Sequence, residues 1–102
     1  MNGYQASRNS VRCPSHPGAV LADMIDSIGR TKSELAGLLG ISRQHFHDIL
    51  GERKPVSPEM AARLGKLFGD GPAVWLRLQA AHDAWHVERE VDVSTIPTIK
   101  AA

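Results

Sequence analysis

The sequence has little of several features that mark common classes of protein. It holds one cysteine, Cys13, in 102 residues, so an internal disulfide is impossible and a reducing, cytoplasmic setting is the simplest expectation. No apolar run approaches the roughly 20 residues of a transmembrane helix, and residues 1–13 lack the apolar segment of a secretory signal. There is no internal repeat. We therefore expect one small domain without a membrane anchor, too short for a deep enzyme cleft.

A strong net charge is also missing, because the formal charge is +1. The charges are nevertheless unevenly distributed. Seven basic and four acidic side chains lie between Arg30 and Lys66, whereas three basic and five acidic ones lie between Leu67 and Ala102. An even scatter of solvated charges is the alternative explanation. A basic middle segment favours contact with nucleic acid, whose phosphates attract such a surface.

The middle of the chain predicts two short helices joined by a tight turn. Thr31 and Glu34 have the spacing of a capping box, and Gly40 stands where a left-handed residue would end the first helix. Ser42 is a good cap for the second helix. The apolar positions expected to pack this pair are Leu35, Ala36, Leu38, Leu39, Ile41, Phe46, Ile49 and Leu50. The pattern is that of a helix-turn-helix at residues 31–51.

Three further helices are expected around this pair. His16-Pro17-Gly18 opens one of them, with Ser15 or His16 as cap and the proline in the first turn. Ser57-Pro58 opens another in the same way. The five predicted helices cover residues 17–28, 32–39, 43–50, 58–68 and 72 to about 88, and the last would bury Val74, Trp75, Leu78, Ala81 and Trp85. We therefore expect an all-α fold class: a five-helix helix-turn-helix domain over residues 15–88, whose motif resembles that of phage-repressor-like proteins.

The two ends of the chain differ from this domain. Residues 1–14 are polar and without periodicity, which predicts a flexible N-terminal arm. Residues 89–102 form a short C-terminal tail, in which the β-branched segment 91–99 could be a strand in this chain, a strand paired with another chain, or disordered.

The exposed face of the second helix carries residue types that suit DNA. Arg43 can donate to guanine or to a phosphate, and Gln44 can pair with adenine. Ser42 can offer its hydroxyl and the helix N-terminus to a phosphate. The other predicted contacts are Lys32, Ser33, Arg53 and Lys54, to the flanking backbone, and His47, to a base or a phosphate. Asp48 is expected to orient Arg43 or Lys54 and not to contact a base.

One such module buries too little surface for tight, specific binding to double-stranded DNA. Two copies about one helical turn apart would suffice, as in dimeric repressors that bind palindromes. We therefore predict a homodimer. Its interface, or the surface for another partner, could involve the acidic C-terminal end and residues 91–99.

Four short patterns occur together in order: His16-Pro17-Gly18, the helix-turn-helix, Gly51-x-Arg53, and Trp75-Leu76-x-Leu78-Gln79. Over residues 15–85 the chain thereby resembles the HigA-type antitoxins of the XRE (Cro/C1-type) helix-turn-helix family. The resemblance implies a bacterial or phage-borne type II antitoxin that dimerises, represses its own operon and neutralises a RelE-like (HigB-type) mRNA interferase. Ala19 and Gly71 depart from the family pattern. The cytoplasm and the nucleoid are the implied locations, and no small-molecule substrate or cofactor is implied.

Two other hypotheses stay open. A stand-alone XRE-family regulator would have the same fold and no toxin partner. A small zinc hydrolase would use His82 and His86, whose spacing is close to that of the zinc-protease pattern H-E-x-x-H. Against the hydrolase, Asp83 occupies the place of the general-base glutamate and no third ligand is evident. We therefore expect no metal, no catalytic residue and no enzymatic activity. Cys13 has no evident base partner.

Overall fold

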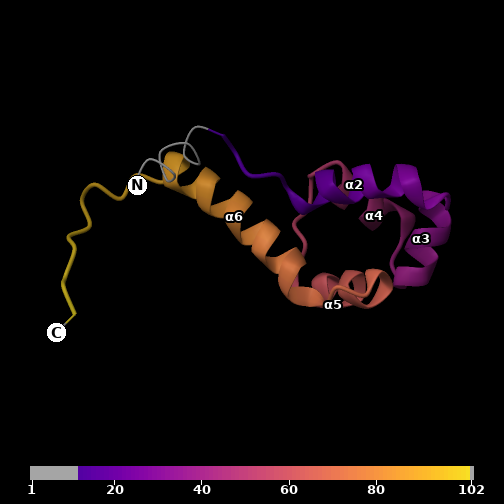
Figure 1. The fold of residues 1–102 in the computed structure, drawn as a ribbon. Coiled ribbons are helices and arrows are strands. Elements are labelled where there is room, and N and C mark those ends of the chain that lie inside the picture. Colours follow the sequence, from indigo (N-terminus) through magenta and orange to yellow (C-terminus); the bar gives the residue numbers. More distant parts are fainter. Residues whose placement is uncertain (1–11, 102) are drawn as a thin grey trace.

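The computed structural model describes residues 12–101, which form five helices and no β-strand (Figure 1). The helices are α2 (Pro17–Ile28), α3 (Lys32–Leu39), α4 (Arg43–Leu50), α5 (Pro58–Phe68) and α6 (Pro72–Glu90). The predicted all-α fold is confirmed, and the last helix runs to Glu90 instead of Glu88. Among the described helices, none is both long enough and apolar enough to cross a bilayer.

Side-chain caps explain why the first four helices begin where they do. His16, Thr31, Ser42 and Ser57 each accept a hydrogen bond from a backbone N–H in the first turn of α2, α3, α4 and α5. Thr31 and Glu34 form the reciprocal capping box that the sequence predicted. These bonds satisfy N–H groups that have no partner within their own helix.

The core lies among α2, α3, α4, α5 and the first half of α6. Its buried apolar residues are Leu21, Ile25, Leu35, Ala36, Leu39, Phe46, Ile49, Val56, Met60, Ala61, Leu64 and Trp75. The prediction that Leu38 belongs to this core is wrong, because its side chain is 59% exposed. Leu38 lies on a side of α3 that no described helix covers.

Helix α6 has two unlike halves. Its first half packs in the core through Trp75 and Gln79, while its second half projects beyond the other four helices (Figure 1). The prediction that Ala81 and Trp85 are core residues is wrong: Ala81 is exposed and Trp85 is half-buried. The guanidinium of Arg89 lies 3.8 Å from the centre of the Trp85 ring. Helical spacing continues to these residues, but none of the helices described within residues 12–101 covers them.

The chain beyond α6 is irregular. Residues 91–101 contain a turn in which the N–H of Ile96 donates to the carbonyl of Val93, and they form no strand. The possible strand at 91–99 is therefore absent from the described chain. Most of the predicted N-terminal arm, residues 1–11, lies outside the described residues, whereas Cys13 and Pro14 run beside α6.

Candidate nucleic-acid interface

The turn between α3 and α4 has the geometry that the sequence predicted. Gly40 adopts a φ of 73°, a left-handed conformation that side chains disfavour. The guanidinium of Arg63, on α5, donates to the carbonyl of Leu39 at 2.8 Å and so caps the end of α3. Ser42 then starts α4 through the N–H of His45. The turn thus fixes the two helices relative to each other and leaves the polar face of α4 exposed to solvent.

The His16-Pro17-Gly18 pattern positions α4 from the other side. Nδ1 of His16 accepts a hydrogen bond from the N–H of Gly18 at 2.9 Å. A Cβ atom placed on Gly18 would lie 1.9 Å from the carbonyl oxygen of Ile49, in α4. Only glycine therefore allows the first turn of α2 to meet the backbone of α4 this closely. The contact sets how α4 lies against the domain.

All eight residues predicted to contact DNA are exposed: Lys32, Ser33, Ser42, Arg43, Gln44, His47, Arg53 and Lys54. A surface groove between α2, α3 and α4 is lined by Lys32, His47 and Arg53, which come from three separate segments. Asp23 and Asp26 line the same groove and offset part of its positive charge. The other predicted residues lie outside its lining.

Asp48 organises the basic end of α4. Its carboxylate accepts from Nε2 of Gln44 at 3.0 Å and from Nε of Arg53 at 3.2 Å, and it lies 3.6 Å from Nζ of Lys54. The Gln44 hydrogen bond contributes most to lowering the pKa of Asp48 below its ordinary value, followed by the hydrogen bond from Arg53, the charge of Lys54 and the charge of Arg53. The prediction that Asp48 pairs with Lys54 is confirmed. In place of Arg43, however, its other basic partner is Arg53.

The loop after α4 is fastened at both ends. Its first residues fold back on the helix, since the N–H groups of Arg53 and Lys54 both donate to the carbonyl of Asp48. At the far end the N–H of Val56 donates to Oε1 of Gln79, in α6, at 2.7 Å. Gln79 is buried, and its Nε2 donates to Asp83 at 2.9 Å. The backbone that carries Arg53 and Lys54 is therefore fixed to α4 at one end and to the core at the other.

Gln79 was not predicted to have this role. It appeared only as the last letter of the Trp75-Leu76-x-Leu78-Gln79 pattern. Gln79 lies one turn after Trp75, on the side of α6 that faces inward. A buried glutamine there needs a hydrogen-bond partner, and this need could have indicated its role.

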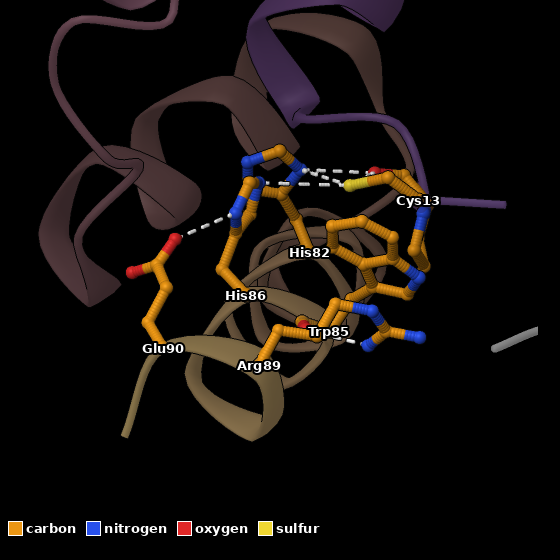
Figure 2. Close-up of polar contacts among 7 residues, drawn as sticks. Cys13, His82, Trp85, His86, Arg89 and Glu90 are labelled. Atoms are coloured by element: carbon orange, nitrogen blue, oxygen red, sulfur yellow. Dashed lines mark hydrogen bonds and ion pairs between the residues drawn. The ribbon is translucent and has the colours of Figure 1, made fainter. Parts of the chain in front are cut away.

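The two histidines of α6 have a third neighbour that the sequence did not reveal. Sγ of Cys13 lies 3.6 Å from a ring nitrogen of each (Figure 2). The expectation that His82 and His86 have no third potential metal ligand is therefore wrong. The expectation that Cys13 has no base partner is also wrong, since both imidazoles lie within reach of its sulfur.

Known proteins resemble this chain along most of its length. An uncharacterized HTH-type transcriptional regulator of Escherichia coli, YbaQ, is 33% identical over 85 residues, which cover 82% of this chain and 75% of YbaQ. No protein-family model matches the chain. Among solved structures, an addiction module antidote protein of the HigA family from Coxiella burnetii has a TM-score of 0.80 at 28% identity and covers 87% of this chain and all of its own.

The chain belongs to the HigA-type antitoxins of the XRE helix-turn-helix family. The antitoxin GraA supports the same assignment, with a TM-score of 0.76 and 32% identity over 89% of this chain and 99% of GraA. GraA has also been solved in complex with its operator. These HigA-type and HTH-type relatives are named as regulators and antitoxins, which are not enzymes.

Proposed function

We propose that this chain is a DNA-binding antitoxin that represses its own operon, with α4 placed in the major groove of the operator. The observation that carries the proposal is the polar face of α4, where Arg43, Gln44 and His47 are exposed on a helix fixed by contacts on two sides. A helix of this size fits the major groove. The solved complex of GraA with its operator supports this use of the fold.

The contacts divide into two kinds. Arg43 is proposed to donate to guanine. Gln44 keeps one amide N–H and its oxygen available for adenine while its other N–H holds Asp48. Ser42, at the N-terminus of α4, is proposed to bind a phosphate. Lys32, Ser33, His47, Arg53 and Lys54 would hold the flanking backbone, and Asp48 aims the last two. Phosphate contacts of this kind fix position, while base contacts give specificity.

Sequence-specific binding would need two copies. A single module of this size buries limited surface on DNA, and two modules about 34 Å apart would contact successive turns of one groove. We propose a homodimer that binds a palindromic operator in the bacterial cytoplasm.

A gel-shift titration on the operon's own promoter tests the division of contacts. Gln44→Ala should weaken binding by about 1–3 kcal/mol and relax preference at one base pair. Lys54→Ala should weaken binding to all sequences alike and reduce the salt slope by about 1. Lys100→Ala, in the tail, is the charge-matched control and should change little. Unchanged binding after Arg43→Ala combined with Gln44→Ala would show that α4 does not contact the bases.

The antitoxin role requires a second surface. We propose that the end of α6 and the tail bind a RelE-like mRNA interferase. Exposed apolar side chains there are Val87, Val91, Val93, Ile96 and Ile99, and the acidic neighbours Glu88, Glu90 and Asp92 would complement a basic, RNA-cleaving partner.

Co-expression with the small basic protein encoded beside this gene tests the toxin partner. Growth should be rescued by the wild-type chain and by the Arg43→Ala, Gln44→Ala double variant, but not by Val91→Asp combined with Ile96→Asp. A chain whose neighbouring gene encodes no such protein, and which still shifts its promoter, would instead be a stand-alone XRE regulator. YbaQ, named as a transcriptional regulator, favours that second candidate.

A further inference from the structure

Three side chains that bind transition metals meet on the outer half of α6. Two of them, His82 and His86, line a surface pocket that also includes Arg53 and Lys54. His82 and His86 lie one helical turn apart, and Cys13 reaches them from the segment before α2 (Figure 2). One donor atom from each lies within 4.8 Å of the other two. Sγ of Cys13 is 3.6 Å from Nδ1 of His82 and 3.6 Å from Nε2 of His86.

The two sulfur–nitrogen separations match the edges of a tetrahedral zinc site. With Zn–S near 2.3 Å and Zn–N near 2.05 Å, a tetrahedral angle places sulfur and nitrogen about 3.5–3.6 Å apart. The two sulfur–nitrogen distances therefore already have the length that a shared ion requires. Thiolate and imidazole donors select zinc-like transition metals over calcium or magnesium.

A second observation concerns the far side of the His86 ring. Its Nδ1 lies 3.1 Å from a carboxylate oxygen of Glu90, one turn further along α6. A proton on Nδ1 shared with Glu90 leaves the lone pair of Nε2 directed at Cys13. Histidines that bind metals commonly donate their other N–H to a carboxylate in this way, which fixes the tautomer and the ring orientation.

The metal-free arrangement has a competing contact. Nδ1 of His82 lies 2.9 Å from the carbonyl oxygen of Pro14, which Sγ of Cys13 also approaches at 3.4 Å. Binding an ion would exchange these two hydrogen bonds for coordinate bonds. The thiol would release its proton to solvent, and the proton of His82 would move to Nε2 by way of water.

We infer that Cys13, His82 and His86 bind one Zn²⁺ ion, with Glu90 as the positioning residue for His86 and the fourth coordination place open to water. All three ligands are half-buried, so the ion can enter from solvent. The consequence for the fold is a tie between two segments 69 residues apart in sequence. The ion would fasten the chain before α2 to the half of α6 in which no described residue is buried.

The experiment uses the full chain without a histidine tag, reduced with a non-thiol reductant and loaded with Zn²⁺ or Co²⁺. The wild type should retain one equivalent of zinc after dialysis, and its cobalt form should show a thiolate-to-metal charge-transfer band. Cys13→Ser should lose that band, and His82→Ala and His86→Ala should each lose retained zinc. Glu90→Gln should weaken zinc binding about 10–100-fold. His45→Ala removes a histidine in α4 and should leave all readouts unchanged.

A structural readout separates this site from chance binding. Trypsin cleavage after Arg12, the residue before the proposed ligand, should be slowed by zinc in the wild type and not in Cys13→Ser. The inference is overturned if the wild type retains no more zinc than the His82→Ala, His86→Ala double variant. It is equally overturned if Cys13→Ser binds zinc as tightly as the wild type. Circular dichroism of each variant confirms that loss of metal is not loss of fold.

Discussion

The two halves of α6 belong to one continuous helix but differ in how their side chains are surrounded. Up to Gln79, α6 contributes buried side chains to a core shared with four other helices. From Ala80 to the end of the described chain, no residue is buried. In the first region a core side chain is enclosed by its neighbours, whereas in the second every side chain keeps part of its surface exposed to solvent.

Matched tryptophan substitutions should give the largest difference. Trp75→Ala should lower the free energy of unfolding by about 3–5 kcal/mol, because it empties a site that is 2% exposed. Trp85→Ala, ten residues later in the same helix, should lower it by about half of that or less, since Trp85 is half-buried and lies outside the core. Urea titration followed by circular dichroism measures both, and Trp75→Phe serves if the alanine variant does not fold. Equal losses would mean that the outer half shares the core.

A pair of glycine substitutions tests the contact that holds α4. Gly18→Ala should lower the free energy of unfolding by about 1–3 kcal/mol, because its Cβ would overlap the carbonyl of Ile49. Gly37→Ala is the control: nothing lies within 4 Å of a Cβ built there, and the change should stabilise α3 by about 0.4–1 kcal/mol. Gly18→Ala should also weaken promoter binding by displacing α4. A stable Gly18→Ala variant with normal promoter binding would show that this contact does not position α4.

The smallest expected effect concerns pH. Burial, followed by the neighbouring charge of His82, lowers the pKa of His16 below its ordinary value of about 6.5. The unfolded chain therefore takes up a proton before the folded chain does, and stability falls as pH drops below about 6.5. His16→Asn keeps a cap acceptor that does not titrate. Urea midpoints at pH 7.5, 6.5 and 5.5 should decline more steeply for the wild type. Parallel declines would assign the pH dependence to other groups.

The packed region was largely predictable because its signals are local. Thr31 with Glu34, Ser42 and Ser57 each mark a helix start within four residues of sequence, and all three caps are present. Periodicity also identified most of the buried face. It failed for Leu38 and Trp85, because spacing shows which side of a helix is apolar but not whether another helix covers it.

The contacts that sequence reasoning missed join distant segments. Cys13 and His82 are 69 residues apart, and Gln79 accepts from a backbone N–H 23 residues away. Nothing local marks such pairs. The pairing of Asp48 with Arg53 was missed for a related reason: the turn after α4 folds Arg53 back over the helix, a geometry that a helical wheel does not describe.

The two faces of α4 have a consequence for how this family diversifies. Phe46 and Ile49 are buried, whereas Arg43 and Gln44 are exposed and contribute nothing to the core. Substitutions on the exposed face should change the preferred operator while the free energy of unfolding stays nearly constant. We expect that single substitutions on this face can change which operator a related chain prefers while the chain stays folded. The independence ends at Asp48, since replacing it would release residues on both the helix and the loop that follows.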